Sequence, residues 1–223
     1  ALLLPILSGI ADYTGNKKKY LKIFTYLGAF ACIGLFFFTS EDVLEWGIFC
    51  VMLASIGYSS GLVFYDAYLP EIAPKNMTDR ISAKGFSYGY AGSVVLLLIS
   101  IFITKKFEMF GFSNVGEATR LVFILVGLWW IGFAQIAFKW LPKNESKKKV
   151  SRDIFRNGYL ELKKVFLSLK KLKNMKMYLV AYFFYNMGVQ TIMLLAILFG
   201  TKELELNSSQ LIPAIIIIQF VLF

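Results

Sequence analysis

Long stretches without a single Asp, Glu, Lys or Arg limit the possible folds of this chain more than any other feature. Six such stretches are rich in Leu, Ile, Val, Phe and Ala and occupy residues 23–40, 46–65, 85–104, 121–138, 177–201 and 206–223. A helix of about 18 to 20 apolar residues crosses the roughly 30 Å of a bilayer core. Spanning strands would show alternating polarity, which these stretches lack. The sequence therefore predicts an all-α polytopic membrane protein.

Composition supports the membrane class and argues against an enzyme. Hydrophobic residues make up 57% of the chain. Cys32 and Cys50 both fall inside predicted spans, so they are expected to pack as small apolar side chains and not to form a disulfide. The sequence contains no His, which removes His-based metal sites, proton relays and general bases. No nucleophile with a base, metal-ligand cluster or phosphate-binding glycine loop is recognisable, so we expect no catalytic activity, metal or cofactor.

The distribution of basic residues predicts the orientation. Three segments, residues 12–22, 67–84 and 139–176, hold 20 of the 24 Lys and Arg residues. Positive residues concentrate on the cytoplasmic side of membrane proteins, so these segments are expected in the cytoplasm. The net charge of +10 then follows from topology and implies no nucleic-acid partner.

The segment over residues 142–176 separates two groups of spans. Its apolar residues recur at steps of three and four between basic ones: Phe155, Tyr159, Leu162, Phe166 and Leu169. This pattern predicts a basic amphipathic helix on the inner leaflet, either as a plain linker or as a lipid-binding switch. The predicted organisation is an N-terminal bundle over 1–141, the linker over 142–176 and the start of a second bundle over 177–223.

The loop SGIADYTGNKKK, residues 8–19, resembles the signature loop between the second and third helices of the major facilitator superfamily. Asp12 is followed three residues later by Gly15 and then by Lys17 and Lys18. The glycine permits a tight turn, and the aspartate can cap a neighbouring helix. The loop departs from the superfamily pattern at three positions: Ser8, Tyr13 and Asn16.

Three motifs, the first of which contains this loop, resemble one branch of that superfamily, the vacuole-effluxer-like proteins. This branch includes the fungal autophagy-related vacuolar amino-acid effluxers and many bacterial transporters. The motifs are PILSGIADYTGNKKKYL, FYDAYLPEIA with DRISAKGFSYGYAGS, and YLVAYFFYNMGVQTI. The resemblance implies a major-facilitator-type helical bundle that is incomplete here, from the end of helix two to part of helix eight of an expected twelve. The chain begins without Met and stops inside an apolar run, which also predicts a fragment of a longer protein.

The resemblance implies a secondary active transporter that moves a small solute, with amino acids as one candidate, by alternating access. A proton or cation would couple the transport. The alternative is a non-transporting membrane receptor or scaffold that retains the fold, which the three departures in the loop keep open. The expected location is a bacterial cytoplasmic membrane, or a vacuolar membrane if the source is fungal. The bilayer is the expected surrounding, and the oligomeric state is not predicted.

Polar residues inside two spans predict the substrate site, because helices four and seven of the superfamily line its central cavity. On helix four, Ser55, Ser59, Leu62 and Asp66 share one face, and Tyr58 and Tyr65 lie beside it. On helix seven, Tyr178, Tyr182, Asn186 and Gln190 repeat every four residues. The predicted substrate-binding residues are Tyr58, Ser59, Tyr65, Tyr182, Asn186 and Gln190. Hydrogen bonds between packed helices are the alternative role for the amides.

The residues predicted to control gating lie in the loop and near its expected partner. They are Asp12, Gly15, Lys17, Lys18, Asp66 and Arg80. By analogy with the superfamily, Asp66 at the inner end of helix four is expected to pair with Lys17 or Lys18 and to hold the cytoplasmic side shut. A role in coupling and an ordinary interfacial position are the alternatives for Asp66. Glu71 and Asp79 are expected to be loop charges.

Overall fold

The structure is a computed structural model that describes residues 16–142 and 172–206, with single residues at 160, 163, 164, 167, 168, 211, 213 and 217. Its regular elements are α2 (Lys17–Gly34), η1 (Leu35–Phe37), η2 (Glu41–Val43), α3 (Leu44–Asp66), α4 (Leu69–Ile72), α5 (Thr78–Lys105), η3 (Phe107–Phe110), α6 (Val115–Trp140) and α8 (Lys173–Lys202). Every regular element in this part of the chain is helical, which confirms the all-α class.

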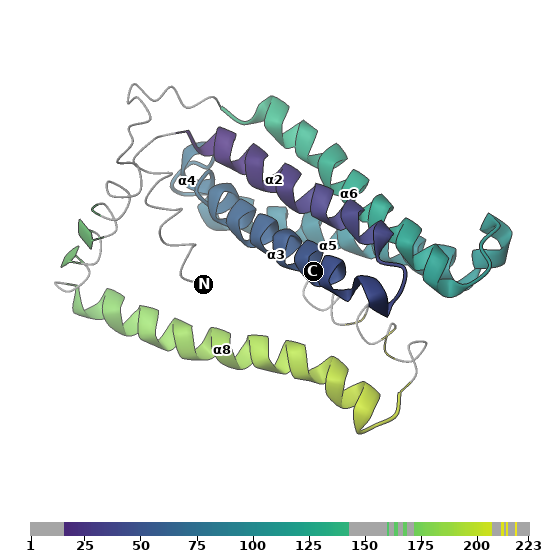
Figure 1. Cartoon of the computed structure of the whole chain (residues 1–223). Helices are drawn as coiled ribbons and strands as arrows, with labels where there is room; N and C mark the ends of the chain where they lie inside the picture. The colour runs from purple at the N-terminus through teal and green to yellow at the C-terminus, as the bar shows by residue number, and fades with distance from the viewer. Residues whose placement is uncertain are drawn as a thin grey trace. The chain divides into compact units, whose positions relative to one another are not determined.

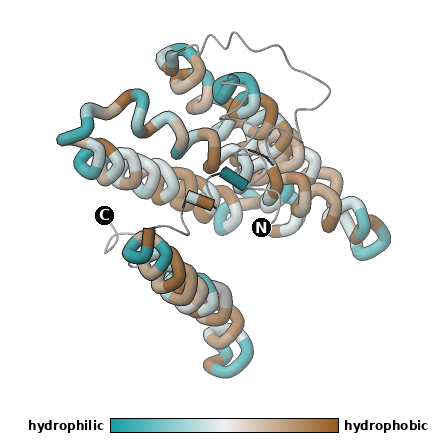
Figure 2. Tube along the Cα trace, turned by 90° about the vertical axis from the view of Figure 1, so that its left-hand side faces the viewer, coloured by the Kyte–Doolittle hydropathy of each residue, from teal (hydrophilic) through white to brown (hydrophobic). Residues whose placement is uncertain are grey.

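Four helical segments are long and apolar enough to cross a membrane within the described residues. They are Lys17–Phe37, Glu41–Ile72, Thr78–Lys105 and Val115–Trp140. The last three contain the predicted spans 46–65, 85–104 and 121–138, and the first covers residues 23–37 of the predicted 23–40. Figure 2 shows hydrophobic colouring along the helical tubes. Residues 177–201 form most of α8. The sixth predicted span and the predicted linker helix lie almost entirely outside the described residues.

The chain divides into two compact units. The first comprises residues 1–85 and 95–162, and the second comprises residues 86–94 and 163–223. The first unit contains α2, α3 and α6, and the second contains α8. The three-part division at residues 141 and 176 remains a prediction.

Within the first unit, α2 packs against both α3 and α6 (Figure 1). Glycines make these contacts very close. A Cβ placed on Gly57 of α3 would lie 2.5 Å from the Cα of Gly28 on α2. A Cβ on Gly127 of α6 would lie 2.8 Å from the carbonyl oxygen of Ala29. Small residues let membrane helices approach so closely that backbone contacts replace side-chain packing.

An aromatic cluster fills one end of this three-helix contact. Its buried members are Leu21 of α2, Phe64 of α3, Phe138 of α6 and Tyr68, which follows α3. The ring of Phe64 stacks on Tyr20 and Phe24, with centroid distances of 5.5 and 5.7 Å. Aromatic pairs at these distances are favourable beyond the area they bury. The cluster therefore holds the start of α2 against the ends of its two neighbours.

Candidate functional site

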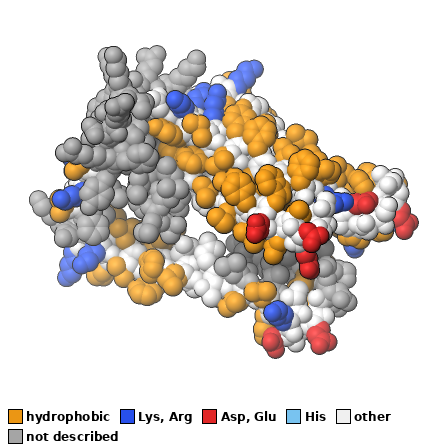
Figure 3. All heavy atoms as spheres, viewed as in Figure 1, with side chains coloured by type: hydrophobic (Ala, Val, Ile, Leu, Met, Phe, Trp, Pro, Cys, Tyr) orange, Lys and Arg blue, Asp and Glu red, His pale blue; other side chains and the backbone are white. Residues whose placement is uncertain are grey.

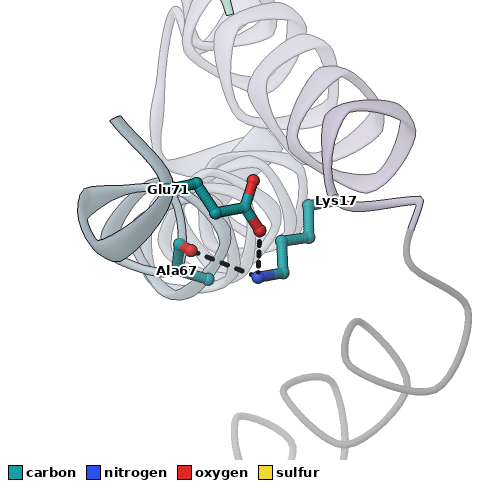
Figure 4. Close-up of polar contacts among 3 residues, drawn as sticks. All are labelled: Lys17, Ala67 and Glu71. Carbon is teal, nitrogen blue, oxygen red and sulfur yellow. Dashed lines mark hydrogen bonds and ion pairs between the residues drawn. The ribbon is translucent and has the colours of Figure 1, made fainter. Parts of the chain in front are cut away.

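Lys17, the first residue of α2, contacts two acceptors: Ala67, which directly follows α3, and Glu71 of α4 (Figure 4). Its Nζ lies 2.7 Å from Oε1 of Glu71 and donates to the carbonyl oxygen of Ala67 at 3.2 Å. The two charged side chains are 15% and 30% exposed, so the ion pair is largely shielded from water. Partial burial and a second hydrogen bond give this contact a more definite geometry than a surface ion pair.

Glu71 is the acid that Lys17 contacts, whereas the sequence predicted Asp66. Helical hydrogen bonds continue beyond Asp66: the amide of Ala67 donates to Val63, and the amide of Glu71 donates to Tyr68. Residues 67 and 71 are therefore one turn apart and face the same side, while residue 66 is turned by about 100° from residue 67. Because the chain makes this extra turn, Glu71 reaches Lys17 and the exposed Asp66 does not.

Lys18 contacts the end of a different helix, α6. Its Nζ donates to the carbonyl oxygen of Leu141 at 2.6 Å, directly after the last residue of α6. Carbonyl groups at a helix C-terminus lack partners within the helix and carry partial negative charge, so a lysine stabilises them. Two adjacent lysines thus fasten the start of α2 to the ends of both antiparallel neighbours.

Of the other predicted gating residues, the two that the structure describes show no comparable contact. Asp12 and Gly15 lie outside the described residues. Asp66 and Arg80 are exposed, and neither forms an ion pair with another described residue. Their roles in gating remain predictions.

The predicted substrate residues of α3 lie away from its contact with α2. Gly57 and Phe64 are buried on the packed side, whereas Tyr58 and Tyr65 are 62% and 54% exposed. Ser59 is half-buried and lies about 200° around the helix from Gly57. The ring of Tyr58 meets Trp130 of α6 edge-on at 6.4 Å, and the hydroxyl of Tyr65 would lie 3.1 Å from a Cβ on Gly85 of α5. Both tyrosines therefore have neighbours that the sequence did not reveal.

The predicted residues of α8 are spaced by four residues and share one side of that helix. Tyr182, Asn186 and Gln190 are exposed, as is every other α8 residue whose side chain the structure describes except Gly200. The rings of Tyr178 and Tyr182 stack with centroids 6.2 Å apart, which shows that side chains four residues apart do share a side. The helices α3 and α8 belong to different units.

A polar pair between α2 and α6 was not predicted. Tyr26 donates its hydroxyl to Oε1 of Gln135 at 3.2 Å, and Nε2 of Gln135 lies 3.0 Å from the same hydroxyl oxygen. Gln135 also donates to the carbonyl oxygen of Ile131 at 3.2 Å. The available signal was that Gln135 is the strongest polar residue in the stretch 121–138. A polar side chain inside a membrane helix is expected to have such a partner.

Apolar helices of spanning length, with charges gathered at their ends, define an integral multi-pass membrane protein. The whole chain, residues 1–223, matches the family described as "Vacuole effluxer Atg22 like", and the chain belongs to that family.

Its relatives include bacterial and fungal proteins. The chain is 33% identical to the uncharacterized MFS-type transporter YxiO of Bacillus subtilis (strain 168), over 99% of this chain and 51% of the relative. It is 26% identical to autophagy-related protein 22 of Vanderwaltozyma polyspora, over 95% of this chain and 46% of the relative. It is 23% identical to autophagy-related protein 22-2 of Neosartorya fischeri, over 94% and 46%. The chain thus spans about half the length of these relatives, and no solved structure matches it.

Proposed function

We propose that the protein is a secondary active transporter that moves a small solute across a membrane by alternating access. The observation that carries this proposal is the match of the whole chain to a family named for effluxers, together with relatives named as transporters. The multi-pass helical fold is the architecture that this function requires. Amino acids are the first solute class to test, and a proton or cation is the proposed coupling partner.

The two sides of α3 support a solute path along it. Glycine contacts and Phe64 occupy the side that packs on α2, whereas Tyr58 and Tyr65 lie on the side left exposed within this unit. Polar groups at membrane depth are costly unless they face a bundle interior or water. We therefore propose that Tyr58, Ser59 and Tyr65 line the path.

The same argument supports the stripe on α8. Asn186 and Gln190 are carboxamides within an otherwise apolar helix, and each can donate and accept hydrogen bonds. Tyr182 lies one turn before Asn186 on the same side. We propose that these three side chains contact the solute.

The contacts of Lys17 and Lys18 support a gating role for the loop before α2. They fasten the first residues of α2, so the loop over residues 12–16 has a fixed point of attachment. We propose that Asp12, Gly15, Asp66 and Arg80 act with these lysines to close the cytoplasmic side, with Glu71 as the acid that positions Lys17. Residues 12–22, 67–84 and 139–176 are proposed to face the cytoplasm, in a bacterial cytoplasmic membrane or a fungal vacuolar membrane.

Flux measurements test the proposal. The protein, expressed from its complete gene and reconstituted in liposomes, should exchange at least one labelled amino acid for internal unlabelled substrate. Empty liposomes and liposomes that contain an Asn186→Ala, Gln190→Ala double variant are the controls. Absence of flux for every solute in the panel, under both proton and sodium gradients, would contradict transport.

A non-transporting receptor or scaffold is the second candidate. It is favoured by the departures of Ser8, Tyr13 and Asn16 from the superfamily loop pattern. This candidate predicts saturable binding of a ligand to the purified protein without exchange in liposomes. Binding and flux measured on the same preparation therefore separate the two functions.

A further inference from the structure

The register of α2 against α6 brings two exposed lysines to the same level of these helices. Three contacts fix the register of these antiparallel helices: Lys18 with Leu141, Tyr26 with Gln135, and Ile33 with Gly127. In each pair the residue numbers sum to nearly the same value, as antiparallel packing requires. Each contact therefore marks one level along the two helices.

Lys22 and Lys139 fall at the same level in this register. Lys22 lies one turn before Tyr26 on α2, and Lys139 lies one turn after Gln135 on α6. Side chains four residues apart share a helix face, so both lysines continue the side on which Tyr26 and Gln135 meet. Both are exposed, and Nζ of Lys22 lies 5.4 Å from the ring centroid of Phe138.

The positive charge of this pair is not balanced by acidic residues on its own helices. No Asp or Glu occurs in α2, and none occurs in α6 after Glu117, which lies near the opposite end. Glu71 contacts Lys17. Among the described residues, neither Lys22 nor Lys139 forms an ion pair. Figure 3 shows Lys and Arg side chains gathered where α2 begins and α6 ends, with hydrophobic side chains beside them.

The surroundings of the pair match a membrane interface. Trp140 is 79% exposed next to Lys139, and tryptophan is enriched at the level of lipid headgroups. One turn deeper than Tyr26 and Gln135, the seam continues with apolar residues. Phe30, 61% exposed, stacks on Tyr26, and Ile131 occupies the corresponding position of α6. From the helix ends inward, the two cations come first, then the polar pair of Tyr26 and Gln135, then an apolar surface. This is the order of headgroup, glycerol region and acyl chain in a lipid.

We propose that the seam between α2 and α6 binds an anionic phospholipid, with its phosphate between Lys22 and Lys139 and an acyl chain along Phe30 and Ile131. Charge complementarity selects an anionic lipid over a zwitterionic one, because two neighbouring cations without an acid repel each other until an anion lies between them. Each lysine near an anionic lipid surface strengthens binding about fivefold. None of its residues is among those proposed to contact the solute.

Native mass spectrometry of the protein from its complete gene tests the site. Phosphatidylglycerol and phosphatidylcholine are titrated into the detergent-solubilised protein, and the dissociation constant of the tightest bound lipid is measured. The Lys22→Gln, Lys139→Gln variant should bind phosphatidylglycerol about 10- to 30-fold more weakly. The matched control is Lys105→Gln, Lys106→Gln, which removes two exposed lysines at the end of α5 and should change the constant less than twofold.

Three further results decide the proposal. The charge-conserving Lys22→Arg, Lys139→Arg variant should retain the bound lipid, and excess inorganic phosphate should not displace it. If the double Gln variant is poorly folded, the single change Lys139→Gln at an exposed position should still weaken binding about fivefold. The proposed lipid site would be overturned by any of three results. These are an equal loss of phosphatidylglycerol affinity in the two double Gln variants, equal affinities of the unchanged protein for the two lipids, and complete displacement of the lipid by phosphate.

Discussion

Gly57 of α3 and Gly28 of α2 lie in direct backbone contact, so close that a Cβ on Gly57 would come within 2.5 Å of the Gly28 backbone. Trp130 of α6 covers Gly28 from another direction, since a Cβ there would lie 2.3 Å from the indole ring. Atoms this close cannot be accommodated without moving one helix or the indole. The absence of side chains at Gly28 and Gly57 is therefore a requirement of the packing.

Gly57→Ala should destabilise the protein. The added methyl group meets backbone atoms, and overpacking of this kind costs about 1–3 kcal/mol. Gly61→Ala, one turn later on α3, is the matched control, because a Cβ there has no neighbour within 4 Å. Gly61→Ala should raise the free energy of unfolding by up to about 1 kcal/mol, because alanine has a higher helix propensity than glycine. Thermal unfolding, followed by fluorescence size-exclusion chromatography, measures the melting temperature of each variant. Equal melting temperatures for Gly57→Ala and Gly61→Ala would show that the close contact is not required.

Glu71→Gln should affect the protein in the same way as Lys17→Gln, because the two side chains form one ion pair at 2.7 Å. The free energy of unfolding of the double variant should fall little below that of either single variant. The coupling free energy between the two changes should be below about 1 kcal/mol. Alkylation of a cysteine placed at Ser59, on the proposed solute path, should increase in all three if the pair keeps the cytoplasmic side closed. Lys19→Gln, an exposed neighbour, is the control.

Asp66→Asn separates the predicted latch from the observed pair. If Asp66 contributes to gating through Lys17, its effect on cysteine alkylation should disappear in the Lys17→Gln background. If Glu71 alone positions Lys17, the effect of Asp66→Asn should be unchanged in that background. Comparison of the single and double variants in one alkylation assay distinguishes these outcomes.

Gln135→Leu and Tyr26→Phe should each remove the hydrogen bond between α2 and α6. The coupling free energy between the two changes is expected to be about 0.6 kcal/mol, typical of hydrogen bonds between membrane helices. A double-mutant cycle from unfolding in detergent measures it. Tyr20→Phe, on the same helix and stacked on Phe64, controls for loss of a tyrosine hydroxyl. Strict additivity of Gln135→Leu and Tyr26→Phe would mean that the bond contributes nothing.

Asn186→Ala and Gln190→Ala should lower solute flux more than they lower the amount of folded protein. Two carboxamides on one side of a largely apolar helix favour a polar contact, and we propose that the solute supplies it. Met187→Leu, an exposed neighbour on α8, should leave flux unchanged. If flux falls only in proportion to folded protein, the amides serve helix packing.

Helix positions were predictable because spanning a bilayer demands long uncharged stretches, but their ends were not. α6 begins at Val115, before the predicted 121, because Asn114 accepts a hydrogen bond from the amide of Glu117 at 2.9 Å and caps the helix. α5 begins at Thr78, before the predicted 85, since its first two turns accommodate charged residues. Loss of charge marks the membrane core, whereas local hydrogen bonding decides where a helix begins.

The partners of the lysines depended on tertiary structure that spacing does not reveal. The sequence identified Lys17 and Lys18 as important, but the acid that reaches Lys17 is set by one additional helical turn after Asp66. The contact of Lys18 with Leu141 joins residues 123 positions apart and uses a backbone carbonyl, which no side-chain pattern can reveal. Likewise, the shared side of the predicted residues on α8 followed from their period of four, whereas the contact of Tyr58 with Trp130 did not.

The bond from Lys18 to Leu141 places a tether where the chain leaves α6. Leu141 immediately precedes the segment 142–176, through which the chain continues from the first group of spans to α8. A displacement of that segment acts first on Leu141, and the hydrogen bond passes part of the force to Lys18 at the start of α2. Such a displacement would therefore act on both α6 and α2, although at this end the segment is covalently attached to α6 alone.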